Sequence, residues 1–128
     1  MNPINLKYTK KHEWLKVEGN KAIIGITDYA QHAMGDVVFV ELPKIGDSLE
    51  LGKSFGVVES VKAVSDIYAP VAGTITAVNE AILDAPETVN LDAFGEAWMV
   101  EVELTDLSQL DDLLNVAQYE AFLQEEAN

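Results

Sequence analysis

Lys62 is the residue of this sequence that is best placed to do chemistry, as an isolated primary amine. It is the only basic residue between Ser54 and the C-terminal Asn128. Its neighbours on either side, Val61 and Ala63, are β-branched or small. Most single lysines are solvated surface charges. Whether Lys62 is an acylation site therefore depends on the secondary structure predicted around it.

The segments that flank Lys62 predict a β-hairpin. Residues 54–60 are apolar and β-branched, which favours a strand. Residues 65–69 predict a second short strand, which ends at Pro70. Lys62 therefore falls near the tip of a hairpin, where the backbone is held and the side chain stands in solvent. Such a position suits a lysine that another enzyme must find and acylate.

Two glycines accompany the lysine at a characteristic spacing. Gly46 lies sixteen residues before Lys62, and Gly73 lies eleven residues after it. Each stands where a neighbouring segment must turn, and glycine tolerates the positive φ that we expect there. The apolar positions between and beside them are Leu49, Val58, Ile67 and Ile75. The constellation resembles the attachment signature of lipoyl and biotinyl domains.

The residues next to the lysine indicate which of these lysine-bearing families the chain resembles. Biotinyl domains surround their lysine with methionines, and the lipoyl domains of 2-oxoacid dehydrogenases usually carry Asp-Lys-Ala, whereas this chain has Val61-Lys62-Ala63. The segment 59–70 resembles the glycine cleavage H-protein family. The similarity extends from about Lys7 to about Phe122, through residues 8–14, 25–31, 35–43 and 95–99.

The resemblance implies a mainly β fold, a lipoyl/biotinyl-like β-sandwich or barrel-sandwich hybrid with short helices and a C-terminal helical segment. It also implies lipoic acid joined to Lys62 as an amide, which makes an arm of about 14 Å from bonds of about 1.5 Å. The strained dithiolane at its end exchanges readily with nucleophiles and reductants. The chain would then be a carrier and shared substrate rather than an enzyme.

The family's partners define the expected cycle. A pyridoxal-phosphate-dependent glycine decarboxylase transfers an aminomethyl group to one lipoyl sulfur, and a tetrahydrofolate-dependent aminomethyltransferase takes the one-carbon unit and releases ammonia. A dihydrolipoamide dehydrogenase then restores the disulfide. Lipoyl-attaching enzymes complete the set of partners. The chain would shuttle aminomethyl groups and reducing equivalents in glycine catabolism and one-carbon metabolism.

Four further residues are expected to serve the arm. An aminomethyl-sulfur adduct hydrolyses in water, so a carrier gains from a cleft that excludes solvent and offers carboxylates to the ammonium. We expect Glu13 and Asp66 to supply them, although both could be ordinary surface acids. Glu59 and Ala63, which lie beside the lysine, are expected to guide the lipoyl-attaching enzyme.

Composition limits the other functions. At 128 residues and 48% hydrophobic content, we expect a single domain over residues 1–128, with C-terminal helices from about 106 to 126. The chain has no cysteine, and we expect no metal site. All 8 basic residues are lysines and the net charge is −14, which repels nucleic acid and anionic membranes. We expect a freely diffusing monomer in a bacterial cytoplasm, or in the mitochondrial matrix of a eukaryote.

The remaining elements follow from local signals. We expect a helix from Thr27 or Asp28 through Met34, with Gln31 completing a capping box from Asp28 and Gly35 ending the helix. In a strand over residues 98–104, alternation places Met99 on the face opposite Trp98 and Val100. Further strands are expected at residues 12–18, 21–26, 37–42 and 73–78, and a helical turn near residues 80–89.

Two rival functions stay open. An enzyme is disfavoured because His12 and His32 are the only imidazoles and no phosphate loop or Ser/His/Asp arrangement is present. A Schiff-base lysine would need burial, which a hairpin tip does not provide, and borohydride trapping on Lys62 would reveal one. A homologue that donates lipoyl groups to other complexes would carry the same lysine. Transfer to a dehydrogenase acceptor would distinguish it.

Overall fold

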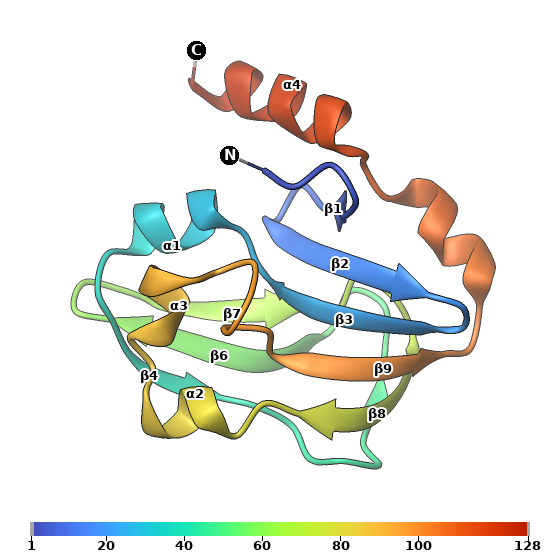
Figure 1. The fold of residues 1–128 in the computed structure, drawn as a ribbon, viewed down its shortest axis with the longest axis horizontal. Coiled ribbons are helices and arrows are strands. Elements are labelled where there is room, and N and C mark those ends of the chain that lie inside the picture. Colours follow the sequence, from blue (N-terminus) through green and yellow to red (C-terminus); the bar gives the residue numbers. More distant parts are fainter. Residues whose placement is uncertain (1, 128) are drawn as a thin grey trace.

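Two antiparallel sheets form the body of the protein in this computed structural model, which describes residues 2–127 (Figure 1). The strand order is β1-β2-β3-β9-β8-β5 in the larger sheet and β4-β6-β7 in the smaller. The larger sheet consists of β1 (Lys7–Tyr8), β2 (Glu13–Glu18), β3 (Lys21–Ile26), β9 (Val100–Leu104), β8 (Gly73–Val78) and β5 (Ser48–Leu49). The smaller consists of β4 (Val37–Glu41), β6 (Ser54–Ser60) and β7 (Val64–Tyr68).

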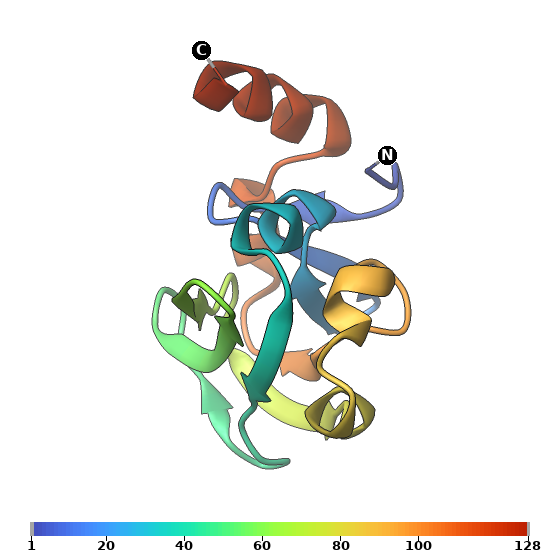
Figure 2. The same cartoon turned by 90° about the vertical axis from the view of Figure 1, so that its left-hand side faces the viewer.

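Short helices cover the ends of this β body, and the longest helix closes the chain. They are α1 (Asp28–Met34), α2 (Ala81–Asp84), α3 (Thr88–Leu91), a 3-10 helix (Leu107–Asp112) and α4 (Val116–Ala127). In the view of Figure 2, α4 lies beyond α1 and away from the smaller sheet. The mainly β architecture with a C-terminal helical segment confirms the fold class predicted from the sequence.

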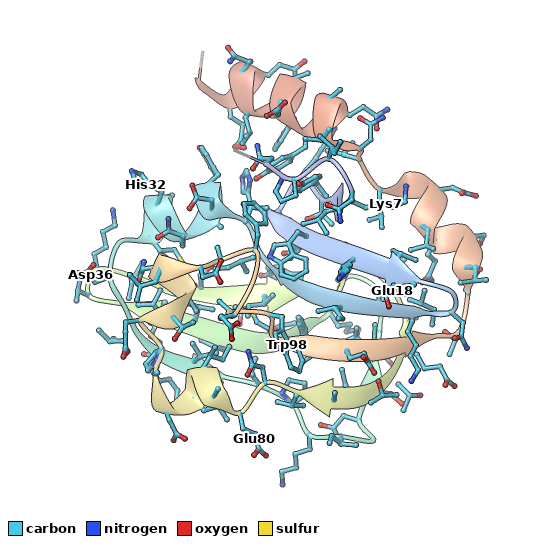
Figure 3. All side chains as sticks on the ribbon, in the orientation of Figure 1. Lys7, Glu18, His32, Asp36, Glu80 and Trp98 are labelled. Carbon is cyan, nitrogen blue, oxygen red and sulfur yellow. The ribbon has the colours of Figure 1, made fainter. Side chains whose placement is uncertain are left out.

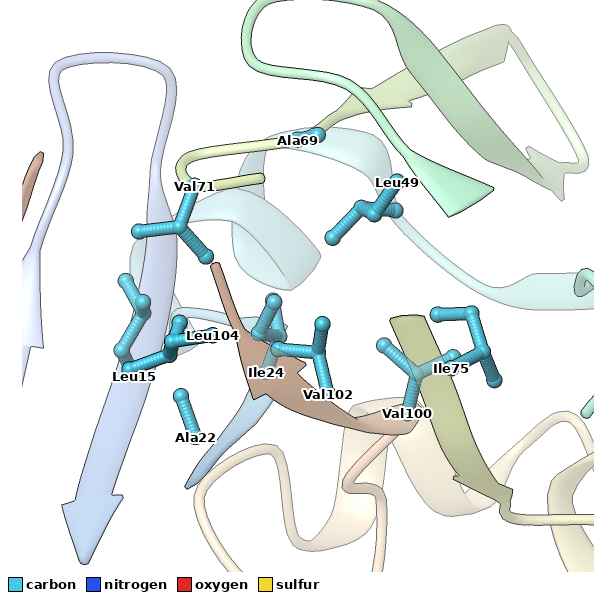
Figure 4. Packing of buried hydrophobic residues seen from close by; sticks show 10 residues of the cluster. All are labelled: Leu15, Ala22, Ile24, Leu49, Ala69, Val71, Ile75, Val100, Val102 and Leu104. Carbon is cyan, nitrogen blue, oxygen red and sulfur yellow. The ribbon is translucent and has the colours of Figure 1, made fainter. Parts of the chain in front are cut away.

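The inward faces of the strands supply the core. Residues of β2, β3, β8 and β9 pack with the short β5 in the largest cluster, which is drawn in Figure 4 and comprises Leu15, Ala22, Ile24, Leu49, Ala69, Val71, Ile75, Val100, Val102 and Leu104. A second cluster joins the smaller sheet to α2 and α3, and includes Val40, Val58, Ile67, Ile82 and Val89. Hydrophobic burial on both sheets therefore holds the β6–β7 hairpin against the rest of the fold.

Helix α4 is attached through aromatic contacts. Tyr119 is fully buried and stacks on Tyr8, with the ring centroids 4.6 Å apart. Trp14 belongs to the same hydrophobic cluster as Tyr8 and Tyr119, and donates a hydrogen bond from Nε1 to the carbonyl of Ala93, at 2.9 Å.

Among the helices of residues 2–127, none has the length and apolar character that crossing a membrane requires.

Two local expectations, for Met99 and Gly73, were wrong. Strand β9 starts only at Val100, so Met99 is not on an outer face but is fully buried in the second cluster. Gly73 does not have a positive φ, unlike Gly46 at 96°; it is required because a Cβ there would overlap the carbonyl of Glu103 on the neighbouring strand. Of the two caps expected for α1, Thr27 is the one used, and its side chain accepts a hydrogen bond from the Ala30 amide.

The capping box expected from Asp28 is also absent from α1. Gln31 Nε2 instead donates to the side-chain Oδ1 of Asp28, at 2.9 Å, so this pair bonds side chain to side chain. Helix α1 ends where predicted, at Gly35, whose amide donates to the Gln31 carbonyl. The helix thus directs the chain from β3 toward β4, past the β6–β7 hairpin (Figure 1).

Candidate functional site

Lys62 lies in the tight turn between β6 and β7, and its side chain is exposed. The turn is closed by a backbone hydrogen bond of 2.8 Å from the Ser60 amide to the Ala63 carbonyl. Ser60 Oγ accepts from the amides of Lys62 and Ala63, at 3.3 and 3.1 Å. The Val61 amide donates to the carbonyl of Asp36, at 3.0 Å. Every amide of the turn is bonded, so the backbone is fixed while the amine is free to solvent.

The segment that holds this turn is itself held by one side chain, Asn90 of α3. Its Nδ2 donates to the Gly35 carbonyl and to Gln31 Oε1, both at 2.9 Å, and its Oδ1 accepts from the Val37 amide, at 2.8 Å. Asp36, the partner of Val61, lies between these two anchored residues and is labelled in Figure 3 at the edge where the turn projects. Asn90 therefore supports the lysine turn from behind.

The stem of Lys62 runs past Gly35, at the C-terminal end of α1. A Cβ on Gly35 would lie 3.6 Å from Lys62 Cε, so the lysine side chain lies next to this glycine. Gly35 has φ 83° and ψ −158°, a conformation that essentially only glycine adopts.

A cleft of about 200 Å³ opens beside α1, between that helix and the smaller sheet. Its walls come from the start of β2, from α1 and from β6 and β7. The lining residues are Lys11, His12, Glu13, Ile26, Tyr29, Ala30, Ala33, Met34, Val58, Ser65, Asp66 and Ile67. The cleft therefore has an apolar floor and contains the two carboxylates predicted from the sequence, Glu13 and Asp66.

Glu13 is the buried acid of this cleft, with 3% of its surface exposed. Thr9 Oγ1 donates to Glu13 Oε1 at 2.6 Å, and accepts from the Glu13 amide. Burial raises the pKa of the Glu13 carboxyl, and the hydrogen bonds from Thr9 and the Tyr68 backbone and the charge of Lys11 offset part of that rise. A buried carboxylate is unfavourable unless it is paired, so Glu13 would be stabilised by a cation in the cleft.

Asp66 differs from Glu13 in its surroundings. It lies on β7, is exposed, and accepts a hydrogen bond from Ser54 Oγ at 3.2 Å. It stands at the rim of the cleft, where it is solvated. The structure therefore brings the two predicted carboxylates to one cleft, but only Glu13 departs from an ordinary surface acid.

The distance along β7 matches the reach of a lysine-borne arm. Asp66 follows Lys62 by four residues, and an extended strand advances about 3.3 Å per residue, so the two are at most about 13 Å apart along the chain. A lipoyl-lysine arm of about 14 Å spans this distance. The amine and the cleft therefore lie within one arm's length of each other.

Comparison with known proteins agrees with this geometry. The family model described as "Glycine cleavage H-protein" matches residues 6–126. The chain belongs to the glycine cleavage H-protein family. A curated relative from Koribacter versatilis, named "Glycine cleavage system H protein", is 59% identical over 125 residues, which cover 98% of this chain and 96% of the relative. One of the same name from Acidobacterium capsulatum is 56% identical over 124 residues, covering 97% and 95%.

A solved structure shares the fold. The crystal structure of a glycine cleavage system H protein from Mycobacterium marinum superposes with a TM-score of 0.87 at 34% identity, covering 99% of this chain and all of that one. Membership of the glycine cleavage H-protein family and the barrel-sandwich fold were both predicted from the sequence and are confirmed.

The other candidate residues of the family motif lie around the turn. Ala63 is exposed, and its amide and carbonyl both bond to Ser60. Glu59 is half-buried on β6, paired across the hairpin with Val64. Both contact or flank the lysine turn rather than the cleft. Their position leaves them accessible to a protein that approaches Lys62.

Sequence reasoning missed the residues that form the rest of the cleft. His12 has a positive φ of 69°, and its Nδ1 lies 2.8 Å from the Tyr119 hydroxyl on α4. Tyr29, Ala30 and Ala33 present one face of α1 to the cleft. The spacing of small residues on α1 was a usable signal, because positions i, i+3 and i+4 share a helix face. The contact of His12 with Tyr119 spans 107 residues and carries no local signal.

Within residues 2–127, no group of three or more His, Cys, Asp or Glu side chains is arranged to bind an ion. The cleft instead offers carboxylates, aromatic rings and a lysine. The carboxylates among these residues can bind a cation.

Proposed function

We propose that the chain is the lipoyl-bearing aminomethyl carrier of a glycine cleavage system, with lipoic acid attached as an amide to Lys62. The observation that carries this proposal is the pairing of an exposed amine in a fixed turn with a two-carboxylate cleft within one arm's length. Lipoate supplies a disulfide that accepts the aminomethyl group and the electrons. The chain's own residues present the arm and shelter its cargo.

The cleft suits the end of such an arm better than a separate substrate. Its volume of about 200 Å³ is below the range of about 300–1,000 Å³ that is usual for small-molecule sites. Lys62 is exposed beside Gly35, and the floor of the cleft is apolar. Oxidised lipoamide is neutral, whereas an aminomethyl group carries an ammonium. Glu13 and Asp66 would bind that ammonium and so favour the loaded arm.

The same geometry supports the predicted partners. A carrier without its own catalytic groups needs a decarboxylase that uses pyridoxal phosphate, a tetrahydrofolate-dependent aminomethyltransferase and a dihydrolipoamide dehydrogenase. Lipoyl-attaching enzymes would recognise the turn through Glu59 and Ala63. Since the curated relatives named above are bacterial, we propose a bacterial cytoplasmic monomer that moves between its partners by diffusion.

The decisive experiment compares the lifetime of the loaded arm. The lipoylated protein is loaded by glycine and the decarboxylase, separated, and assayed for release of formaldehyde and ammonia. Glu13→Ala with Asp66→Ala should keep lipoylation intact and shorten the lifetime of the cargo. Glu80→Ala with Asp84→Ala, two exposed acids near α2, is the matched control and should change nothing. An unchanged lifetime in the cleft variant would reject the assigned role of the two carboxylates.

Recognition by the attaching enzyme is tested separately. The rate of lipoylation of Glu59→Ala, measured with lipoate ligase, ATP and lipoate, should fall relative to the unmodified sequence. A variant at Glu41, an exposed acid on β4, serves as the control. Equal rates in both variants would remove Glu59 from the recognition surface.

A further inference from the structure

Lys11 is a cation already present in the cleft. It lines the cleft together with Glu13 and Asp66. Its Nζ lies 3.9 Å from the centre of the Tyr68 ring, which is a close cation–π contact. Tyr68 follows Asp66 on β7 by two residues, and its backbone amide is a partner of the Glu13 carboxylate. The ammonium of Lys11 is therefore held at the mouth of the cleft by groups that also surround the two acids.

The charges around the cleft show what Lys11 does there. Glu13 and Asp66 can each carry one negative charge, and Lys11 carries one positive charge. His12 is the other basic group that lines the cleft. Its burial lowers the pKa of the imidazole and favours the neutral form. Lys11 is thus the only full positive charge among the lining residues described. A second ammonium entering this space would meet like-charge repulsion from Lys11.

Lys11 also borders a second groove. This groove has a volume of about 370 Å³ and shares Lys11 and Glu13 with the cleft. Its remaining wall is mostly apolar, with Leu51, Pro70 and Leu113, and it contains one further acid, Asp112. The long, exposed side chain of Lys11 can therefore leave the cleft without losing an acidic neighbour.

We propose that Lys11 competes with the cationic cargo for the cleft, and so sets how readily the loaded arm is released. When the arm is neutral, the ammonium of Lys11 offsets the charge of Glu13. When the aminomethyl ammonium enters, Lys11 is displaced toward the neighbouring groove. This inference rests on the proposed function for the identity of the cargo, but the competition concerns the chain's own residues.

The test replaces the charge and keeps the length of the side chain. Lys11→Met should lengthen the lifetime of the loaded arm about 1.5- to 5-fold, the range expected for the interaction of exposed charges. The assay is run at the same pH, near 8, for every variant. Lys10→Met is the matched control, because Lys10 lines the second groove but not the cleft. Its lifetime should equal that of the unmodified sequence.

A second readout needs no lipoate. In the unmodified chain, methylammonium chloride is titrated against the protein and followed by the NMR shifts of Glu13 and Asp66. Lys11→Met should bind methylammonium about 1.5- to 5-fold more tightly, and Lys10→Met should not. The pKa of the Glu13 carboxyl should rise in Lys11→Met alone, because the charge that lowers it has been removed.

The outcomes separate this inference from the proposed function. Equal or weaker methylammonium binding by Lys11→Met overturns the competition, whatever the arm carries. If Lys11→Met binds methylammonium more tightly but Lys62 is never lipoylated, the proposed function fails while the competition at the cleft stands. A shorter lifetime of the loaded arm in Lys11→Met would show that Lys11 shields the cargo, and would overturn the inference.

Discussion

Replacing Asn90 with alanine tests whether the lysine turn is held from behind. The substitution removes the hydrogen bonds that Asn90 makes to Gln31, Gly35 and Val37. Val37 is 3% exposed, so its amide would be left buried without an acceptor. The residue between the freed positions, Asp36, would then hold the Val61 amide less firmly.

The magnitude follows from the bonds lost. Each net hydrogen bond contributes about 1 kcal/mol, so Asn90→Ala should lower the free energy of unfolding by about 3 kcal/mol. For a chain of this length that corresponds to a fall in Tm of about 10 °C. If the turn loses the equivalent of its bond to Asp36, about 1 kcal/mol, lipoylation of Lys62 should slow about two- to five-fold.

Asn79 provides the matched control. Asn79 is a buried polar residue, and its Nδ2 donates to the carbonyls of Glu96 and Trp98, at 2.8 and 2.7 Å. Asn79→Ala should therefore lower the stability by about 2 kcal/mol without touching the lysine turn. Urea unfolding and the kcat/KM of a lipoate ligase are measured for both variants well below their unfolding midpoints. Equal lipoylation in the two variants would refute the role of Asn90 in presenting Lys62.

Three further predictions concern the residues around the arm. Gly35→Ala should lower the free energy of unfolding by about 1–3 kcal/mol, because alanine is strained at φ 83° and ψ −158°, and an unchanged urea midpoint would contradict this. Since burial raises the pKa of Glu13, its ionised form is unfavourable in the folded state; Glu13→Gln should raise the urea midpoint near pH 7, and the gain should vanish as the pH falls below about 4.5. Burial lowers the pKa of His12, so stability should fall as the pH drops through about 6.5, and His12→Asn, which tolerates the positive φ, should lessen that fall while His32→Asn should not.

Local features of the site could be predicted from the sequence because they depend on neighbouring residues. The hairpin around Lys62 follows from two short apolar segments and a proline, and α1 follows from Thr27 and Gly35. The family was identified from residues near the lysine and confirmed over nearly the whole chain. These elements depend on little beyond backbone propensity and turn chemistry.

Features that depend on contacts between distant segments could not be predicted. The burial of Glu13 results from the pairing of β2 with β3 and from Thr9, and nothing in the local sequence distinguishes Glu13 from the exposed Asp66. Met99 was placed on the wrong face because the strand begins at Val100, two residues later than the alternation indicated. Gly73 was explained by φ, whereas the approach of a neighbouring strand requires it.

The identity of the group on Lys62 is the most direct test of the whole account. Intact-mass measurement of the protein purified from its native host, followed by fragmentation, locates any covalent addition. We predict an increase equal to one lipoic acid less one water, placed on Lys62 alone. A chain that is unmodified in a host whose dehydrogenases are lipoylated, or that carries the group on another lysine such as Lys53, would contradict it.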